Sequence, residues 1–476
     1  MKNLKEYLLD AASKEKNQIS AENPYREIGF DQNKARLGWV KPVNFSQIRS
    51  SLELILPLLE NKEKFIFIGM GGSVNGIKPL LSVFGRDKIF TLDNLDPKAI
   101  DNILSGVDDL EKTLVVAVSK SGTTKETQLL SQTLKSYFSQ KLGVDKWVKN
   151  FLWLTDPESF EKLDKKGWSS VEKMLIQFDG RSDVGGRFSS PLTNIFILPL
   201  FLFLNKNFDK LEQFYLQFIN SQDTIRNAAH NSVLSLSRED DFNFSPHVGQ
   251  DLVEYFTPWL AQLFQESLGS KNAEKSVKTI VNFSGSEFIK LKPDFNFREP
   301  VFSIMAQMYF YQLFIAYLAG RWNINFVNQE FVEKYKKKMS LLEKSDKESE
   351  NLLSGNVASL AEPISKKIKD KHRFIEVVLY FVPDQEIVSL IQKELEAKFD
   401  QKITLVFVGS DWNHQCYQAA FADKTTFYAL IYLSSYENRK FIAKERIDEN
   451  LETLKRIALA TYQTLLDKSI LFVLKR

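Results

Sequence analysis

The sequence contains a single cysteine, Cys416, among its 476 residues. A disulfide within the chain is therefore impossible, and such sparse use of cysteine is typical of proteins in a reducing compartment. Histidine is also scarce, with four in the whole chain. Because no cluster of histidine, cysteine and carboxylate residues has the spacing of metal ligands, we expect neither a bound metal nor a cofactor.

Long hydrophobic runs are lacking as well. The longest, residues 195–204 (IFILPLFLFL), has ten residues, about half of a membrane span, which needs roughly 20. A buried core helix explains it better. The N-terminal segment, MKNLKEYLLDAASKEKNQIS, is charged and amphipathic and has no apolar core of the kind found in signal peptides. We therefore expect a soluble, cytoplasmic protein that does not bind a membrane.

No large excess of charge of one sign is present. The 63 lysines and arginines exceed the 60 acidic residues by only three, and the two signs are interspersed. This balance predicts no nucleic-acid partner. Hydrophobic residues make up 43% and charged residues 26%, which are ordinary proportions for a globular protein with real cores. The length allows two or three domains of about 150 residues each.

Short apolar runs alternate with segments long enough for helices. After a helical N-terminal segment, the candidate strands cover residues 65–68, 89–92, 114–118, 151–154 and 174–178. Strands without polar alternation, separated by helices, predict a parallel sheet buried on both faces. Later in the chain we expect helices at 258–266, 301–319, 385–399 and 446–469, and strands at 279–283, 374–381, 403–408 and 427–433.

Two loops in the first α/β region carry candidate ligand-binding residues. FIFIGMGGSVNG (65–76) runs from a strand into a glycine-rich turn, which by itself predicts either a dinucleotide site or a tight strand–helix turn. SKSGTTKET (119–127) has five hydroxyl side chains and two lysines at a helix start. This composition predicts a phosphate site, the alternative being a polar loop with Thr124 as helix N-cap. Two such loops after neighbouring parallel strands favour a shared pocket.

Two later motifs carry charge. In DVGGRFSSPLTN (183–194), two glycines place Arg187 on a turn where it can approach an anion; the alternative is a structural pair with Asp183. In TPWLAQLFQESLGS (257–270), the Thr-Pro pair predicts a helix start, and Gln262 and Glu266 lie one turn apart. A carboxylate at a helix C-terminus costs stability but suits a general base. The alternative is a solvated surface glutamate.

In order and approximate spacing, GMGGS, SKSGTTKET, GGRFS and QLFQES resemble the motifs of glucose-6-phosphate isomerases. The resemblance implies an α/β fold with two doubly wound parallel-sheet sugar-isomerase (SIS) domains, flanking helices and a C-terminal α/β extension. The domain ranges that we expect are an N-terminal helical segment (1–44), a first SIS domain with the phosphate-binding loop (45–240), a second SIS domain carrying the base (241–340), and a C-terminal region that completes the second lobe (341–476).

The resemblance also implies roles for individual residues. Glu266 corresponds to the catalytic base, Arg187 to the arginine that steadies an enediolate, and Gln262 to a substrate-binding glutamine. VNQEFVEKYKKKM (327–339) keeps the family's seven-residue interval between Gln329 and an active-site lysine, Lys336. Without the resemblance, Lys336 belongs to a solvated face. The implied sugar-phosphate contacts are Gly72, Ser73, Ser119, Lys120, Ser121, Thr124, Thr127 and Gly186.

The family's ring-opening histidine has no clear counterpart, because residues 272–300 contain no histidine. Three possibilities follow: His414 takes this role, Lys336 shares it, or the sugar ring opens unaided. Residues 381–418 resemble the isomerase part of bifunctional transaldolase–glucose-6-phosphate isomerases. The sequence upstream of the isomerase motifs is too short for a transaldolase barrel, so we expect isomerase activity alone.

The implied activity is the reversible isomerisation of glucose-6-phosphate and fructose-6-phosphate through a cis-enediol, in glycolysis and gluconeogenesis, by a homodimer that uses no metal. One alternative is a broader phosphosugar isomerase that accepts mannose-6-phosphate or an amino sugar. Another is a non-catalytic sugar-phosphate sensor. A sensor predicts an intact phosphate loop without the base and the arginine, and the presence of both Glu266 and Arg187 argues against it.

Overall fold

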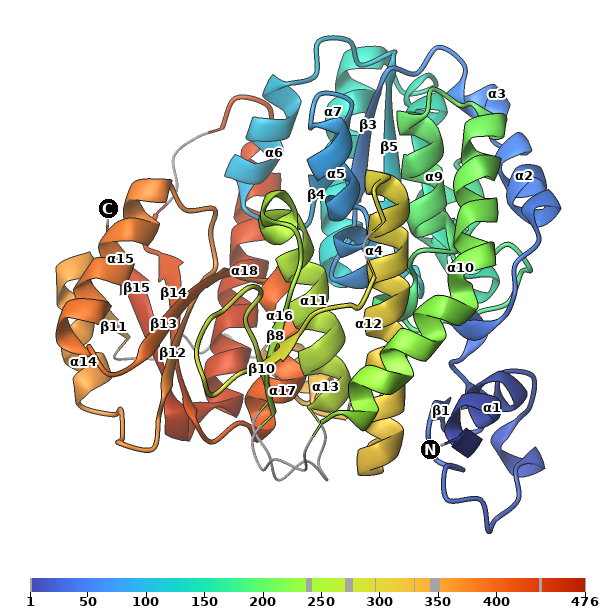
Figure 1. Ribbon diagram of the computed structural model, residues 1–476. Helices are drawn as coiled ribbons and strands as arrows, with labels where there is room; N and C mark the ends of the chain where they lie inside the picture. Colours follow the sequence, from blue (N-terminus) through green and yellow to red (C-terminus); the bar gives the residue numbers. More distant parts are fainter. Residues whose placement is uncertain are drawn as a thin grey trace. The chain divides into compact units, whose positions relative to one another are not determined.

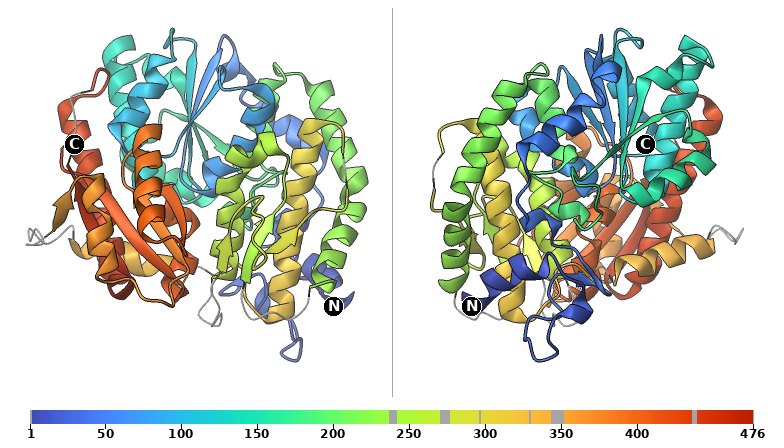
Figure 2. Two further views of the ribbon diagram at one scale, coloured as in Figure 1. Left: turned by 60° about the vertical axis from the view of Figure 1, so that its left-hand side comes forward. Right: turned by 90° about the vertical axis from the view of Figure 1, so that its right-hand side faces the viewer.

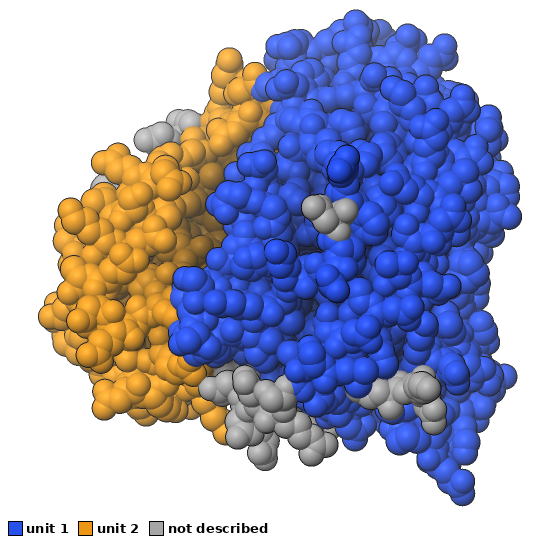
Figure 3. Space-filling view, in the orientation of Figure 1, with its two compact units in different colours: residues 1–93, 106–328 blue, residues 94–105, 329–476 orange. Residues whose placement is uncertain are grey.

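The computed structural model describes residues 2–236, 242–269, 277–295, 297–328, 330–342, 352–435 and 439–475, the side chains of residues 2 and 3 excepted. The chain forms two compact units, which Figure 3 colours separately. Unit 1 contains Met1–Asp93 and Gly106–Asn328, and unit 2 contains Asn94–Ser105 and Gln329–Arg476. A five-stranded sheet, entirely parallel, forms the centre of each unit.

The first sheet has the strand order β4-β3-β5-β6-β7. Its strands are β3 (Lys64–Ile68), β4 (Ile89–Leu92), β5 (Thr113–Val118), β6 (Phe151–Thr155) and β7 (Glu172–Leu175). The predicted parallel sheet is confirmed, and β5 and β6 are buried along their whole length, as their unbroken apolar runs indicate. The last strand starts two residues before the predicted one, because an edge strand tolerates the polar pair Glu172 and Lys173.

Helices cover both faces of this sheet (Figures 1 and 2). They include α4 (Gly72–Asn75), α5 (Lys78–Phe84), α7 (Lys125–Leu142) and α9 (Asn194–Phe203). Every residue of α9 is buried, which confirms the core helix predicted for this apolar run. The N-terminal segment contributes α1 (Lys2–Ala11), α2 (Phe45–Glu53) and α3 (Leu56–Leu59).

Unit 1 also contains a three-stranded parallel sheet, in the order β10-β8-β9. Its strands are β8 (Phe242–Pro246), β9 (Val277–Thr279) and β10 (Ile289–Leu291), and the helices beside it are α10 (Phe208–Leu234), α11 (Val253–Leu268) and α12 (Pro300–Trp322). Within the described residues, α12 alone is long and apolar enough to span a membrane, and 94% of its most apolar window is buried inside the protein. It serves here as a core helix packed against α10 and α11.

Helix α11 corrects one prediction. We expected it to begin at Thr257 and Pro258, but it begins at Val253, and the proline lies inside it. Pro258 has no N–H to donate to the carbonyl one turn earlier. The Thr257 hydroxyl donates to the Val253 carbonyl at 2.6 Å. The Thr-Pro pair therefore lies within the helix and does not mark its start. The strand predicted at 279–283 is observed earlier, as β9.

The second five-stranded sheet has the order β11-β15-β14-β12-β13. It consists of β11 (Leu353–Gly355), β12 (Phe374–Leu379), β13 (Ile403–Val408), β14 (Thr426–Leu433) and β15 (Ser469–Leu474). Alternate apolar residues of β12, β14 and β15 pack against α14 (Ala361–Ser365) and α15 (Gln385–Lys398), while α18 (Lys444–Thr464) contacts β14 and β15. The helix predicted at 446–469 is observed as α18 and ends five residues earlier than expected, at Thr464; the last predicted residue, Ser469, instead begins β15.

Helix α6 (Pro97–Ser105) follows β4 of the first sheet in sequence but packs within unit 2. Just before it, the Asp96 carboxylate accepts the Val382 N–H at 2.6 Å, and the Asn94 amide donates to the Gly409 carbonyl at 2.9 Å. Burial raises the pKa of the Asp96 carboxyl, against the lowering effect of the Val382 hydrogen bond. The compact units thus divide the chain near residue 328 and around α6, whereas the predicted domain ranges end at 240 and 340. Those ranges stay a hypothesis.

In unit 2, Lys468 contacts several backbone carbonyls at the C-terminus of a helix. The Lys468 ammonium donates to the carbonyls of Ala420 (2.7 Å), Phe421 (3.1 Å) and Asp423 around the end of α17 (Tyr417–Ala422). Because Lys468→Met leaves these carbonyls without a charged donor, we expect it to cost about 1–3 kcal/mol. Hydrogen exchange read by mass spectrometry should show faster exchange in α17 and unchanged exchange in β3 and β5. The exposed Lys398→Met serves as control, and equal exchange in both variants would contradict the prediction.

Candidate active site

The two glycine- and serine-rich loops follow β3 and β5, which are hydrogen-bonded neighbours. Both loops therefore leave the same edge of the sheet, where the carboxyl ends of parallel strands meet. Chain order within the sheet reverses between these two strands, which is where open α/β sheets bind ligands. The two loops thus lie at one edge of the sheet, as a shared pocket requires, and the pocket itself stays a prediction.

The first loop lies in close contact with the loop that carries the arginine. A Cβ atom added to Gly72 would lie 2.3 Å from the Gly186 carbonyl oxygen, so only glycine fits. Gly71 has a positive φ of 53°, which also favours glycine. Ser73, the next residue, is half-buried. A close approach of two backbones therefore explains Gly72, and a positive φ explains Gly71.

The second loop presents hydroxyl groups at the N-terminus of α7. The Ser119 and Thr124 hydroxyl oxygens lie 3.1 Å apart, and those of Ser121 and Thr123 lie 2.9 Å apart. Thr124 occupies the N-cap position, but its side chain makes no capping hydrogen bond, so capping does not explain this residue. Thr127 is buried, and its hydroxyl has no hydrogen-bond partner in the described part of the chain.

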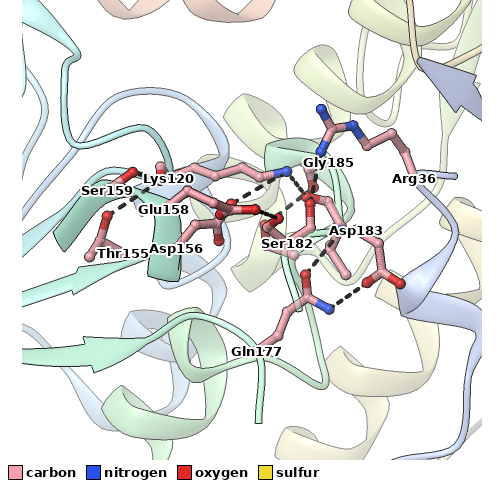
Figure 4. A network of polar contacts seen from close by, with 12 residues as sticks. Arg36, Lys120, Thr155, Asp156, Glu158, Ser159, Gln177, Ser182, Asp183 and Gly185 are labelled. Atoms are coloured by element: carbon pink, nitrogen blue, oxygen red, sulfur yellow. Dashed lines mark hydrogen bonds and ion pairs between the residues drawn. The ribbon is translucent and has the colours of Figure 1, made fainter. Parts of the chain in front are cut away.

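Lys120, the first of the two lysines in the second loop, contacts other parts of unit 1. Its ammonium donates to the Val184 carbonyl and lies 3.8 Å from the Asp156 carboxylate (Figure 4). Lys120 therefore connects the second loop to the segment that precedes Gly185 and Gly186. We expected Lys120 to contact the sugar phosphate; in the structure its ammonium contacts Val184 and Asp156.

Arg187 forms a buried ion pair with Glu266. It lies in the short 3-10 helix Gly186–Phe188, is only 2% exposed, and its Nη1 atom lies 3.1 Å from Glu266 Oε1. The guanidinium also donates to the Ser267 hydroxyl at 2.8 Å and to the Phe326 carbonyl. Burial lowers the pKa of Arg187, and the Glu266 carboxylate opposes this shift.

This pairing excludes one of the two interpretations of the arginine, and its approach to an anion stays a prediction. Asp183, the alternative partner, has its carboxylate 3.1 Å from the Lys41 ammonium and accepts a hydrogen bond from the Gln177 amide at 2.7 Å. The predicted alternative, a structural pair between Arg187 and Asp183, is therefore wrong. The arginine is directed to Glu266.

Glu266 lies near the C-terminus of α11 and is 6% exposed, so the alternative of a solvated surface glutamate is also wrong. One turn earlier, the Gln262 amide donates to Glu266 Oε2 at 2.8 Å. On its other side, the Gln262 oxygen accepts a 3.5 Å hydrogen bond from Asn75, a fully buried residue of α4. The arginine thus contacts one carboxylate oxygen and the glutamine the other.

Sequence reasoning missed Asn75, Ser267 and the Phe326 carbonyl. Asn75 is a polar residue within the first glycine-rich motif, and Ser267 directly follows the glutamate, so both could have been found as polar neighbours of candidate residues. The sequence gives no sign of the Phe326 carbonyl as a partner of Arg187, because every residue has a backbone carbonyl.

The remaining predicted site residues belong to unit 2. Lys336 lies on α13 (Val332–Leu342), has 44% of its side chain exposed, and pairs with Glu333 at 2.9 Å. His414 is half-buried on α16 (Asp411–Gln415). Gln329 lies outside the described residues. The roles that the resemblance implies for these three residues stay predictions. In the described ranges, no group of three or more histidine, cysteine or acidic residues is placed to hold a metal.

Comparison with known proteins identifies related sequences. Residues 60–230 match the phosphoglucose isomerase family; this segment includes both loops and Arg187 and ends before Glu266. A glucose-6-phosphate isomerase from Campylobacter jejuni is 31% identical over 247 residues, which are 48% of this chain and 57% of the relative. A probable glucose-6-phosphate isomerase from Methanococcus maripaludis is 35% identical over 149 residues, 30% of this chain and 32% of the relative.

A solved glucose-6-phosphate isomerase from Chlamydia trachomatis has the same type of fold. It is 18% identical, with a TM-score of 0.52, and the alignment covers 72% of this chain and 83% of that chain. At this identity the likeness shows the fold alone, an α/β fold of the SIS type. The chain matches little more than half the length of the C. jejuni relative.

Gly72→Ala tests the contact between the first loop and the arginine loop. The added methyl group would meet the backbone of Gly186 at 2.3 Å and of Arg187 at 2.7 Å, and overpacking of this kind costs about 1–3 kcal/mol. We expect a lower midpoint of thermal unfolding and faster hydrogen exchange around Arg187. Gly249→Ala is the matched control, since its nearest neighbour to the added atom is a flexible leucine at 3.8 Å. Wild-type behaviour of Gly72→Ala would contradict the close approach.

Proposed function

We propose that this chain, a member of the glucose-6-phosphate isomerase family, interconverts glucose-6-phosphate and fructose-6-phosphate through a cis-enediol. The observation that carries the proposal is the buried contact between Arg187 and Glu266, at 3.1 Å. An aldose–ketose isomerisation needs a base for the proton on C2 and a cation for the oxygen that becomes negative. The site places one group of each kind side by side.

Glu266 acts as the base in this proposal. It removes the C2 proton, and the resulting acid returns the proton to C1, so one carboxylate serves both carbons. Arg187 stabilises the negative charge that develops on the enediolate oxygen. Because burial excludes water from both groups, their interactions with the enediolate are stronger than they would be at a surface. The hydrogen bond from Gln262 orients the carboxylate.

The second loop binds the phosphate group. Ser119, Ser121, Thr124 and Thr127 supply hydroxyl donors, and the N-terminus of the 18-residue helix α7 supplies backbone N–H groups and a favourable dipole. The first loop contributes Gly72 and Ser73 from the neighbouring strand. Phosphate bound at this edge of the sheet leaves the sugar carbons to extend toward Arg187, which the first loop contacts through Gly186.

Several features of the family extend the proposal. Gln329 contributes to substrate binding, and either His414, Lys336 or no protein group assists ring opening. The enzyme works as a cytoplasmic homodimer in glycolysis and gluconeogenesis, without a metal or cofactor. Two observations support the isomerase over a sugar-phosphate sensor: the base is present, and it is paired with the arginine inside the protein.

Glu266→Gln tests the base. Glutamine keeps the shape of the side chain and an oxygen that can accept from Arg187, but it cannot take a proton. Loss of a general base costs about 10²- to 10⁴-fold in rate, so kcat for fructose-6-phosphate should fall by that factor in a coupled assay with EDTA present. The matched control is Glu254→Gln on the same helix, whose carboxylate is 73% exposed and pairs with Arg86. It should keep wild-type kcat.

The same assay separates the alternatives. Binding of fructose-6-phosphate to folded wild-type protein without turnover would refute the isomerase and favour the sensor. Turnover of mannose-6-phosphate at a comparable kcat/KM would show the broader specificity. Because Glu266→Gln leaves Arg187 without a charged partner, circular dichroism must show that the variant folds. Glu266→Asp keeps the charge but moves it back by one methylene, and this variant should also lose activity.

A further inference from the structure

The Lys120 side chain makes contacts that phosphate binding does not require. Its ammonium donates to the Val184 carbonyl at 2.5 Å and lies 3.8 Å from Asp156 Oδ2 (Figure 4). Only 29% of the side chain is exposed. The Val184 carbonyl belongs to the segment that precedes Arg187, and Asp156 belongs to the turn after β6.

The backbone of the second loop is held without help from this side chain. The Ser119 carbonyl accepts from the Thr155 hydroxyl at 2.6 Å, and the Lys120 carbonyl accepts from the Asp156 N–H at 3.2 Å and the Ser159 hydroxyl at 2.9 Å. These donors all come from the end of β6 and the turn after it. Removing the lysine side chain therefore leaves the loop's own anchors in place.

The segment 184–187 is fixed at two points by the two loops. At one end, Val184 receives the lysine hydrogen bond on its carbonyl and donates its N–H to the Gln177 amide oxygen at 3.0 Å. At the other end, Gly186 lies against Gly72 of the first loop. Arg187 follows directly, so its backbone position depends on both contacts.

We propose that Lys120 is a positioning residue, which ties the phosphate-binding loop to the Val184 carbonyl and so holds Arg187 in place for the reaction. The inference rests on the proposed function and deepens it. A positioning role for Lys120 can be distinguished by measurement from a direct contact between its ammonium and the phosphate. A phosphate contact would support substrate binding in every state, whereas a positioned arginine matters most when negative charge develops in the transition state.

The charges around the ammonium give the link a pH dependence. Burial, together with repulsion by Arg36 and Lys34, lowers the pKa of Lys120 to about 8, while Asp156 and Asp183 oppose this shift. Burial raises the pKa of the Asp156 carboxyl to about 6; attraction by Lys120 opposes this rise, and repulsion by Glu158 adds to it. Between about pH 6 and pH 8 the lysine is therefore protonated and Asp156 is ionised. Above about pH 8 the lysine loses its charge, and the link to Val184 weakens.

The first test is Lys120→Met, which keeps the length of the side chain and removes its donor. Because displacement of a catalytic group by about 1 Å can cost on the order of 10²-fold, kcat should fall roughly 10- to 100-fold. The inhibition constant of inorganic phosphate should change less than about twofold, since the loop anchors remain. Lys165→Met, which removes an exposed lysine paired with Glu161, should leave both values unchanged.

The outcomes of this test are distinct. A phosphate inhibition constant that rises as much as kcat falls would show that the ammonium binds phosphate and would overturn the proposal, as would an unchanged kcat. If wild-type protein does not turn over fructose-6-phosphate, the proposed function fails by itself. The link is then judged by hydrogen exchange of residues 184–189, which should be faster in Lys120→Met than in Lys165→Met; equal exchange would overturn it.

A second pair of variants covers the case in which Lys120→Met does not fold. Asp156→Asn removes the negative charge that favours the protonated lysine, so the alkaline limb of the kcat–pH profile should move to lower pH. Lys120→Arg keeps a donor that stays charged, so most of kcat should be retained and the limb near pH 8 should disappear. A limb that stays in place in both variants would show that Lys120 does not control the reaction.

Discussion

The burial of Arg187 against Glu266 is the constraint on which the rest of the site depends. Removing two charges from water costs several kcal/mol for each ion, and the pair is tolerated only if its remaining hydrogen-bonding groups are satisfied. The protein meets this condition with Gln262 and Ser267 from α11 and with the Phe326 carbonyl from the segment after α12. The positions of these two helices, set by packing in the interior of unit 1, therefore decide where the acid–base chemistry can occur.

A second constraint is the close approach of three loops. Gly72 touches Gly186, and the Lys120 ammonium reaches Val184, so the arginine loop is held between the two loops at the sheet edge. Glycine is required at position 72 because a side chain would meet backbone atoms, which cannot move aside as a flexible side chain can. The loops at the sheet edge and the segment that carries Arg187 are therefore in direct contact at two points.

Much of the fold could be predicted because its signals are local. The strands β3, β5 and β6 are short apolar runs that are almost entirely buried, and the loops after β3 and β5 carry recognisable glycine and hydroxyl patterns. The errors occurred where local signals conflicted with packing. Pro258 suggested a helix start, yet α11 begins five residues before it, at Val253. The predicted tail helix was five residues too long at its C-terminal end, because Ser469 pairs with Tyr428 of β14 as the first residue of β15.

The sequence by itself determined which residue types follow the strands of the first sheet, since strand patterns and loop composition are encoded in neighbouring residues. It left Arg187 with either an anion or Asp183 as its partner, and Glu266 with either a surface or a buried position. Only the tertiary structure decided these, because Asp183 and Glu266 are four and 79 residues from Arg187 in sequence, and which carboxylate meets the guanidinium depends on how α11 packs. The partner of Lys120 was hidden for the same reason: its acceptor is a backbone carbonyl 64 residues away.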